Sequence, residues 1–428
     1  MRRRYGSRPS RQSSGKANSA APPRSPWAPW RDCSSVGALR PASRSSRARG
    51  SASKGGSARA GRRAREDAAR MRGRGAVGRA RRERRNVEHR KKGAGLPGEF
   101  EVIQRIGHAL PEPDPSVLLG IGDDAAAITP APGMTTLLTT DTFVEGVDFD
   151  LAFSSWRQIG WKCMAANFSD IAAMGGVPRH ALTTLCLPGH RALDDVEALY
   201  AGFQDLAGHA GHPVSIVGGD LSSTDGPTVI SITVSGEASE EHIARRSGAR
   251  AGDILCVTGH LGASEIGLRL LRLARERPVD RFEGVLCRHR TPVPRVREGV
   301  LLANSGWVHA MIDVSDGLSS DALHVARDSG VGLNLDGNAL PITEETRQAM
   351  EELRLDPVGT ALESGEEFEL LCAVAPEGVE RLAAELAERT GTPLTPIGEC
   401  VTAARGYTIT DQTGSRPLRP KGYEHFSG

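Results

Sequence analysis

A chain of 428 residues can form two ordinary domains, and its formal net charge of +2 hides two opposite parts. Residues 1–95 contain 28 Lys and Arg and only five acids, interleaved with Ser, Gly and Pro, so this part cannot bury enough apolar surface to fold. The rest of the chain has 26 basic and 47 acidic residues, a formal charge of −21. This excess argues against nucleic acid as a partner and suits a cationic small molecule or a site rich in divalent metal.

We expect residues 1–95 to be a disordered Arg/Ser-rich extension, or the product of a start site assigned too far upstream. Two alternatives remain open. A basic tail can bind nucleic acid or another acidic surface. An Arg- and Ser-rich leader with few acids also resembles an organelle transit peptide.

The remaining composition favours a soluble, cytoplasmic protein with no membrane partner. No apolar run approaches the roughly 20 residues that a bilayer span needs, and no signal peptide is visible. The seven cysteines include no C-x-x-C pair and have no neighbouring His at zinc-ligand spacing. We therefore expect most of them to be small core residues in a reducing compartment.

From Gly98 onward, strand-like and helix-like stretches alternate, which is typical of an α/β protein. A polar stretch at 239–252 suggests two domains, 96–240 and 241–428, after the extension. Short runs rich in β-branched or aliphatic residues predict strands at 136–140, 181–187, 214–217, 229–234, 254–258, 310–313 and 369–374. Apolar residues at three- and four-residue spacing predict helices at 156–174, 194–210, 263–275, 319–329 and 376–389.

Aspartates gather at the ends of these strands, next to glycines. Mg²⁺ is usually shared between a few carboxylates, water and substrate phosphates, so acids delivered from several strand ends can build such a site. Each motif alone is as well explained by a turn or a helix N-cap. Five such sites occur, at Gly122–Asp124, Thr139–Asp141, Asn167–Asp170, Gly218–Asp220 and Asp313–Gly317.

Glycine turns beside these acids offer backbone N–H groups to phosphate oxygens. The sequence contains no G-x-x-x-x-G-K-[ST] motif, no G-x-G-x-x-G opening a helix after a strand, and no G-x-S-x-G. The sequence therefore argues against a Walker-type ATP site, a dinucleotide-binding fold and a serine hydrolase. From the residues alone we infer metal-dependent phosphate chemistry on an unidentified substrate.

In order along the body, these motifs resemble the thiamine-monophosphate kinase family. The likeness runs from Gly98-Glu99-Phe100 through NFSDIAAM at 167–174, DVSDGL at 313–318 and Gly365–Glu369 to KGYEHF at 421–426, and does not include the tail. The wider group includes aminoimidazole ribonucleotide synthetase, selenophosphate synthetase and a hydrogenase maturation factor. The resemblance implies an α/β fold of α+β type with two domains, and a homodimer formed through the amino-terminal sheets.

The resemblance also implies Mg²⁺-dependent transfer of the ATP γ-phosphate to thiamine monophosphate, without a catalytic nucleophile. Such chemistry needs positioning and neutralisation of charge more than covalent catalysis. The positions carried over as metal ligands are Asp124, Thr139, Thr140, Asp141, Asp170, Asp220, Asp313 and Asp316. Those implied to contact ATP are Gly219, Asp220, Arg246, Ser315 and, against the adenine, His212. Those implied to face the thiamine end are Glu366, Tyr423 and Asp148.

Three departures from the family pattern stand out. Asp148 replaces the usual His after Glu-Gly-Val, and His212 replaces a Tyr of some relatives. The usual Gly-Gly-Glu-Asp reads Ser364-Gly365-Glu366-Glu367. None removes an expected metal-binding acid, so we expect activity, with substrate affinity the property most open to change.

Two rival functions remain. A sister ATP-dependent synthetase would share the acids and the nucleotide site, but the KGYEHF ending favours the kinase. A nucleotide- or metal-binding module without catalysis, recruited through the basic tail, belongs to a different class. It would not need every one of the expected metal ligands.

Overall fold

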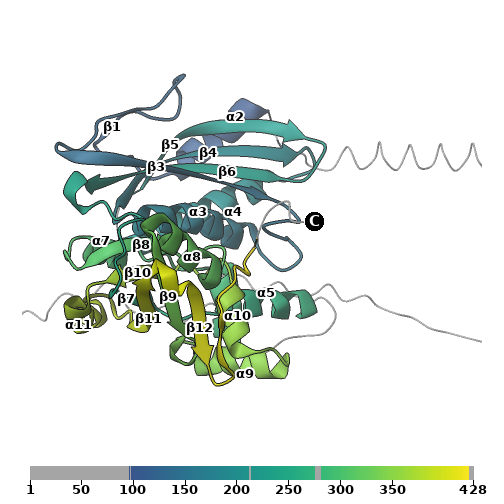
Figure 1. The fold of residues 1–428 in the computed structure, drawn as a ribbon. Helices are drawn as coiled ribbons and strands as arrows, with labels where there is room; N and C mark the ends of the chain where they lie inside the picture. Colours follow the sequence, from purple (N-terminus) through teal and green to yellow (C-terminus); the bar gives the residue numbers. More distant parts are fainter. Residues whose placement is uncertain (1–95, 97, 212–213, 275–280, 424–428) are drawn as a thin grey trace, which may run out of the picture. The chain divides into compact units, whose positions relative to one another are not determined.

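The computed structural model describes residues 96, 98–211, 214–274 and 281–423. The expected extension at 1–95 lies outside them. Helices pack against one four-stranded and one seven-stranded sheet, and most neighbouring strands are antiparallel (Figure 1). This architecture confirms the predicted α/β fold of α+β type.

The elements up to residue 239 surround the four-stranded sheet, whose strand order is β3-β6-β4-β5. A small antiparallel pair, β1 and β2, precedes it. Their bounds are α2 (Glu99–Ala109), β1 (Val117–Leu119), β2 (Ala127–Ile128), β3 (Met134–Val144), α3 (Trp156–Ala173), β4 (Val177–Pro188), α4 (Leu193–Ala210), β5 (Ser215–Thr224) and β6 (Val229–Ser239).

The later elements surround the seven-stranded sheet, whose order is β13-β12-β9-β11-β7-β10-β8. The strands are β7 (Ile254–Thr258), β8 (Val308–Asp313), β9 (Val331–Asp336), β10 (Leu370–Val374), β11 (Leu394–Thr402), β12 (Tyr407–Asp411) and β13 (Gly414–Pro417). The helices are α5 (Ala263–Ala274), α6 (Glu283–Arg290), α7 (Val296–Ala303), α8 (Leu318–Ser329), α9 (Glu344–Glu352), α10 (Pro357–Glu363) and α11 (Val379–Thr390). Single 3-10 turns are η2 (Glu240–His242), η3 (Gly337–Ala339), η4 (Pro376–Gly378) and η5 (Ala403–Arg405).

The four-stranded sheet has a covered face, on which helices pack, and an opposite, uncovered face on which no helix of the described residues packs. Along β6, Ile230, Ile232 and Val234 are fully buried and alternate with hydroxyl-bearing residues that remain partly exposed. Helices α3 and α4 lie on the covered face (Figure 1). The alternation therefore aims half of each strand's side chains at α3, and the other half away from the core.

Helix α3 is buried around nearly its whole circumference. A capping box between Ser155 and Gln158 begins it, and 14 of its 18 residues are buried. It crosses α4 at two glycines: a Cβ on Gly160 would lie 2.1 Å from the Leu199 carbonyl oxygen, and one on Gly202 would lie 2.0 Å from that of Arg157. Only glycine permits this approach, and α3 becomes the central helix of the body.

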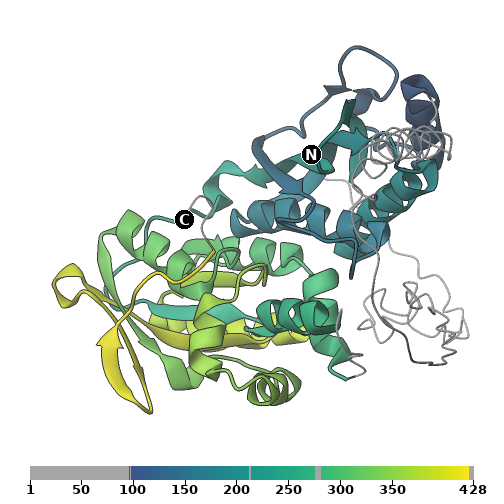
Figure 2. The same ribbon diagram turned by 90° about the vertical axis from the view of Figure 1, so that its right-hand side faces the viewer.

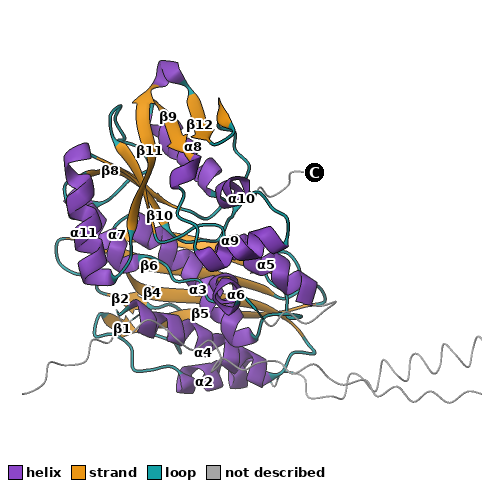
Figure 3. Ribbon diagram, turned by 90° about the horizontal axis from the view of Figure 1, so that it is seen from below, coloured by secondary structure: helices purple, strands orange, loops and turns teal. Residues whose placement is uncertain are grey.

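The centre of the seven-stranded sheet is buried on both faces. In β10 all five residues from Leu370 to Val374 are buried, as expected for an uninterrupted apolar run. Alternate residues contact different partners: Leu370, Cys372 and Val374 join the core around α3, whereas Leu371 and Ala373 join a second core with α8. Helices accordingly lie on both sides of this sheet (Figures 2 and 3).

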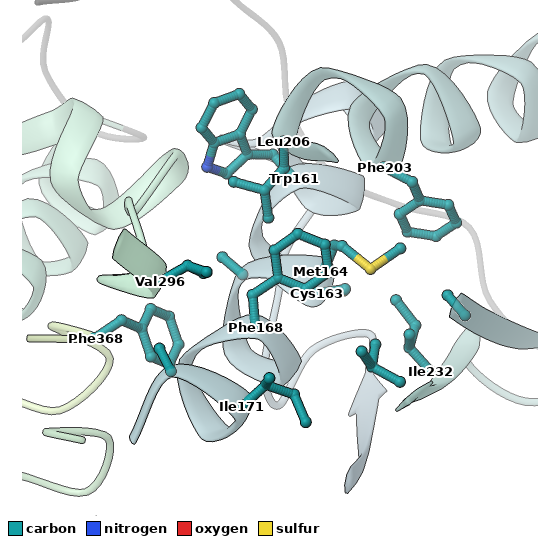
Figure 4. Packing of buried hydrophobic residues seen from close by; sticks show 14 of the residues in the cluster. Trp161, Cys163, Met164, Phe168, Ile171, Phe203, Leu206, Ile232, Val296 and Phe368 are labelled. Carbon is teal, nitrogen blue, oxygen red and sulfur yellow. The ribbon is translucent and has the colours of Figure 1, made fainter. Parts of the chain in front are cut away.

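The main core is continuous from the four-stranded sheet through α3 to the larger sheet. Figure 4 shows Met164 and Phe168 of α3 between Phe203 of α4 and Ile232 of β6 on one side and Val296 and Phe368 on the other. Helix α3 is thus held against both sheets, and the side chains that it carries have fixed neighbours. No helix in the described part of the chain is long and apolar enough to cross a membrane.

Candidate active site

A cavity of about 1270 Å³ lies beside α3, enclosed by the loop after β3, by α5 and α10, and by the last described residues. Helix α3 contributes Lys162 and Ala166 to its wall, and α6 contributes His289 and Arg290. The expected site residues that line this cavity are Asp141, Asp148, Ser315, Asp316, Glu366 and Tyr423.

Three carboxylates from different elements lie near this cavity, and one of them, Asp141, lines it. Asp141 lies on β3, Asp170 on α3, and Asp313 at the end of β8. Asp170 lies close enough to raise the pKa of both others through charge repulsion. Hydroxyl groups fix two of them: Thr139 Oγ1 donates to Asp170 Oδ2, and Ser169 Oγ donates to Asp313 Oδ2 at 2.7 Å.

This carboxylate cluster, Asp141, Asp170 and Asp313, holds more negative charge than the protein compensates. Burial, followed by the charge of Asp170, raises the pKa of Asp141 to about 7. Burial and then the charge of Asp170 also raise the pKa of Asp313. Burial raises the pKa of Asp170 itself, although the Thr139 hydroxyl and the charge of Arg246 oppose the shift. Ionising all three together is therefore costly.

A hard divalent cation fits this chemistry. The donors are oxygens only, they are largely buried, and they repel one another, a combination that a bound cation would stabilise. Within the described ranges, however, no three Asp, Glu, His or Cys side chains lie close enough together to form a metal-binding group. The fit therefore rests on the kind of donor and on their charge, not on a formed coordination sphere.

Two other expected metal ligands lie on the opposite face of the four-stranded sheet. Thr139 and Asp141 point toward α3, but Thr140 between them pairs with Thr233 on the uncovered face, with their hydroxyl oxygens 3.0 Å apart. Asp220 is exposed on β5 and pairs in register with Thr184. The structure does not bring these two side chains into the carboxylate cluster.

Gly219 and Asp124 complete the expected residues of this half. A Cβ on Gly219 would lie 2.0 Å from the Thr183 carbonyl oxygen, so β4 and β5 require a glycine there. Asp124 is exposed in the segment between β1 and β2, and its backbone N–H donates to Asp123 Oδ1 at 2.8 Å. Asp124 has no hydrogen bond to the carboxylate cluster in the described part of the chain.

The turn at 313–318 brings Ser315 and Asp316 to the cavity. Its backbone is held by Asp321, which accepts hydrogen bonds from the N–H groups of Ser315 and Gly317 at 3.2 Å each. Asp321 is a residue that the sequence analysis missed. Burial, then the charges of Asp313 and Asp316, raise its pKa to about 8. An acid in the first turn of a helix that follows Asp-Gly was the available signal.

Glu366 meets two residues that sequence reasoning did not select. Lys162 Nζ lies 2.6 Å from Glu366 Oε2, and His289 Nδ1 lies 3.7 Å from the same oxygen. Burial, then the charge of Lys162, lowers the pKa of His289 well below its usual value, so this imidazole is neutral. A lysine within the apolar run of α3 was the signal for Lys162, because a buried ammonium needs a partner.

Ser364 and Glu367, the two residues of the 364–367 loop at which the resemblance implied a departure, bind each other. Ser364 Oγ donates to Glu367 Oε1 at 2.5 Å, and the Ser264 N–H donates to the same oxygen at 3.1 Å. Ser364 Oγ in turn accepts the Glu265 N–H at 3.1 Å. Ser364 thus supports Glu367, and the loop is tied to the start of α5.

The remaining expected contacts are distributed around the cavity. Asp148 lines it, and its Oδ2 accepts the Val144 N–H at 2.8 Å. The Tyr423 backbone N–H donates to the Asp316 carbonyl oxygen at 3.0 Å, while its side chain is half-exposed at the cavity. Arg246 is exposed, and its charge opposes the rise that burial causes in the pKa values of Asp170 and Asp313. His212 lies outside the described residues.

Comparison with known families places this fold and site in a class. Residues 122–238 match the family model "AIR synthase related protein, N-terminal domain", and residues 250–411 match "AIR synthase related protein, C-terminal domain". The structure of hydrogenase maturation protein HypE in complex with ATP shares the fold, with a TM-score of 0.61 at 21% identity over 78% of this chain and 97% of that one. The protein is therefore an AIR synthase-related protein.

More similar relatives identify the family within this class. Thiamine-monophosphate kinases of Rhodopirellula baltica and Bacillus subtilis are 37% and 38% identical over 73% and 77% of this chain, and over 92% and 99% of their own lengths. The crystal structure of the Stenotrophomonas maltophilia enzyme has a TM-score of 0.63 at 34% identity, over 74% of this chain and 98% of that one. AaThiL complexed with AMPPCP and TMP gives 0.61 at 32%, over 77% and 97%. The chain belongs to the thiamine-monophosphate kinase family, which confirms the resemblance.

Proposed function

We propose that this protein uses ATP to phosphorylate thiamine monophosphate to thiamine diphosphate, as a step of thiamine diphosphate biosynthesis. The γ-phosphate of ATP is transferred directly, by in-line displacement. The carboxylate cluster carries this proposal, because it gathers buried, undercompensated acids from three elements beside a cavity. The family membership supplies the substrates, and a relative's structure holds AMPPCP and TMP together. Neither rival function has a comparable observation in its favour.

The acids would act by holding Mg²⁺. Asp141, Asp170 and Asp313 are the first candidates, with Thr139 as a neutral donor, and Asp124, Thr140, Asp220 and Asp316 as the other expected ligands. When bound, Mg²⁺ supplies positive charge that neutralises phosphate oxygens. The chain's own part is to hold the acids rigidly, through the hydroxyls of Thr139 and Ser169.

Other residues would orient the two substrates. Arg246 near the cluster is placed to offer a cationic fork to ATP phosphates. Gly219, Asp220, Ser315 and His212 are the other proposed ATP contacts. On the thiamine side, a carboxylate and an aromatic ring both suit the cationic thiazolium, and Glu366 and Tyr423 line the cavity. Asp148 adds a second acid there, and no nucleophile is needed.

A second copy of the chain is the proposed partner of the uncovered sheet face. Leu138 of β3 and Leu182 of β4 lie on this face with 74% and 44% of their surfaces exposed. Met134, also on β3, is 39% exposed. Exposed apolar residues gathered on one face favour an interface. Light scattering should give the mass of a homodimer, and Leu138→Lys should shift it toward the monomer. A monomeric wild type would contradict this proposal.

We also propose the cytoplasm as the site of action, and a division of the body into an N-terminal domain at 96–240 that holds metal and ATP and a C-terminal domain at 241–428 on the substrate side. The thiamine-monophosphate kinase family membership supports the location. The separation of the two sheets near residue 240 supports the boundary. Thermolysin should first remove the extension expected at 1–95 and should then cut the remaining body near 240–250. A body that is cut first at another place would contradict this boundary.

The deciding experiment is an assay of the full chain with ATP, Mg²⁺ and thiamine monophosphate, following thiamine diphosphate formation. Free thiamine is the control acceptor, and EDTA in place of Mg²⁺ is the control for metal. We expect product from the monophosphate alone and none with EDTA. ATP binding without turnover would favour the non-catalytic module. ATP turnover that ignores thiamine monophosphate would favour a sister enzyme.

A further inference from the structure

Lys162 is a charged residue in the most buried helix of the body. Its side chain is only 7% exposed, and it lies among apolar residues of the main core. An ammonium in such a place is stable only with a close anionic partner. Among the described residues, Glu366 is the one carboxylate within ion-pair distance of it, with Nζ 2.6 Å from Oε2.

A neutral imidazole completes the contacts of Lys162. His289 Nε2 lies 3.5 Å from Nζ, and His289 Nδ1 lies 3.3 Å from Ser264 Oγ. The tautomer consistent with both contacts donates from Nδ1 to Ser264 and accepts at Nε2 from Lys162. Lys162 therefore has two fixed partners, which leave its ammonium little freedom.

Glu366 has an unusual backbone that fixes where its side chain starts. Its φ of 55° lies in the left-handed region that disfavours residues with a Cβ, and its N–H donates to the Ser315 carbonyl oxygen at 2.7 Å. The side chain is 34% exposed and lines the cavity. Lys162 engages Oε2, whereas Oε1 makes no hydrogen bond within the described residues.

We propose that Lys162 is a positioning residue, which holds one carboxylate oxygen of Glu366 so that the other is presented to the thiamine end of the substrate. The inference rests on the proposed function, in which Glu366 recognises thiamine monophosphate. Lys162 and Asp170 are eight residues apart on α3, about 12 Å along the helix axis. The rigid helix α3 thus fixes the spacing between the residue that positions Glu366, at the cationic end of the acceptor, and the acids near the phosphate end of the acceptor.

Removal of Lys162 should change the affinity for thiamine monophosphate, and the direction of that change distinguishes a positioning role from an effect of charge alone. If the ammonium acted only as a charge, its loss would remove a repulsion of the cationic thiazolium and would tighten binding. If Lys162 positions the carboxylate, its loss lets Glu366 rotate and weakens binding. The proposal commits to weaker binding.

The test compares Lys162→Met with Arg157→Met. Both change a cation of α3 to an unbranched apolar residue, but Arg157 is half-exposed, pairs with Asp205 of α4 and does not line the cavity. We expect Lys162→Met to raise KM for thiamine monophosphate about tenfold, with kcat and KM for ATP changed less than twofold. Arg157→Met should change none of these constants. Circular dichroism melting checks that both variants fold.

A double variant tests whether Lys162 acts through Glu366. In the Glu366→Gln background, Lys162→Met should raise KM by less than twofold, because the carboxylate that it positions is already gone. An additive tenfold effect, an unchanged KM or a lower KM in the single variant would each overturn the proposal.

Isothermal titration with thiamine monophosphate separates this inference from the proposed function. A wild type that binds thiamine monophosphate without turning it over would overturn the function, while the comparison of binding still tests Lys162. A wild type that does not bind it would overturn both.

Discussion

Two buried acids, Glu369 just before β10 and Asp313 at the end of β8, have opposite electrostatics. Asp313 pairs in register with Leu370, the residue after Glu369, and both side chains are almost fully buried. Burial alone would raise the pKa of Glu369, but the charge and hydrogen bonds of Arg295, then the charge of Arg288, lower it. Burial and the charge of Asp170 raise the pKa of Asp313.

The difference between the two acids is the number of cations that the protein supplies. Glu369 receives bonds from Arg295 at 2.5 and 2.6 Å, from Arg288 at 3.1 Å and from Thr258 at 2.8 Å. Among the described residues, Asp313 receives one hydroxyl at 2.7 Å, a backbone hydrogen bond and the charge of Arg246 alone. A saturated buried acid stabilises the fold, whereas an undercompensated one leaves room for ligand cations. Burial of an acid therefore does not by itself indicate function.

The largest effect is expected from a substitution of Asp313. Asp313→Asn should lower kcat/KM about a thousandfold, because a group that serves the charged transition state is lost. Without Mg²⁺ the variant should be as stable as the wild type or more stable, because repulsion from Asp170 is relieved. Steady-state kinetics and melting in EDTA measure the two effects. Near-normal activity would remove Asp313 from the proposed site.

Magnesium supplies the control for the Asp313 variant. Mg²⁺ should raise the melting temperature of the wild type more than that of Asp313→Asn, because a ligand that binds only the folded state stabilises it. An equal rise in both proteins would show that Mg²⁺ binds elsewhere.

Glu369 should respond in the opposite way. Glu369→Gln leaves Arg295 and Arg288 without their carboxylate and should lower the free energy of unfolding by about 3–5 kcal/mol. Urea denaturation without Mg²⁺ measures it, with Asp313→Asn as the matched variant. A loss below about 1 kcal/mol would mean that the arginines find other partners.

Glu367 is a third buried acid, and its ionisation should make the stability of the protein depend on pH. Burial raises its pKa to about 7, although Ser364 and Arg288 oppose the shift. Since the folded pKa exceeds the unfolded value, the folded state binds more protons between about pH 4.5 and 7, and stability falls as pH rises through that range. Glu367→Gln should remove about 2 kcal/mol of this decline. Urea denaturation from pH 5 to 8 should show a flatter profile for the variant.

The smallest expected effect concerns Ser364. Ser364→Gly removes a hydrogen bond to Glu367 and should cost about 1 kcal/mol of unfolding free energy. Combining it with Glu367→Asp, which restores the usual family pair, should cost less than the sum of the single changes. Full additivity would show that the two residues are independent.

The sequence predicted the elements with strong local patterns. The strand at 254–258 is β7 with the predicted bounds, and the helices predicted at 156–174 and 194–210 match α3 and α4 within a residue. The helices α2, α6, α7, α9 and α10 were missed. Of these, α6 is basic, α9 is acidic and α10 begins with Pro357, and packing rather than periodicity stabilises these three. The missed strands are β1, β2, β9, β11, β12 and β13. For β12 and β13 the reason is that their outer positions are polar.

The site was predictable where chemistry is written in short motifs. Asp141, Asp170 and Asp313 were named from their motifs, and Asp170 lies close enough to the other two to raise their pKa values. The expectation that these acids stand at strand ends was right only for Asp313, because Asp141 lies inside β3 and Asp170 inside α3. Lys162 contacts His289, 127 residues later in the chain, and Glu366, 204 residues later. No local sequence pattern could predict contacts over such separations. The separation of Thr139 from Thr140 depended on which face α3 covers, and that is a tertiary fact.

Because α3 has 14 of its 18 residues buried, it has no side on which substitutions could accumulate freely. In a scan of every substitution along the chain, tolerance along α5 and α11 should rise and fall with the helical repeat, since each has an exposed face. Along α3 it should stay low at nearly every position, without a period. Lineages of this protein would then diverge around a nearly constant central helix.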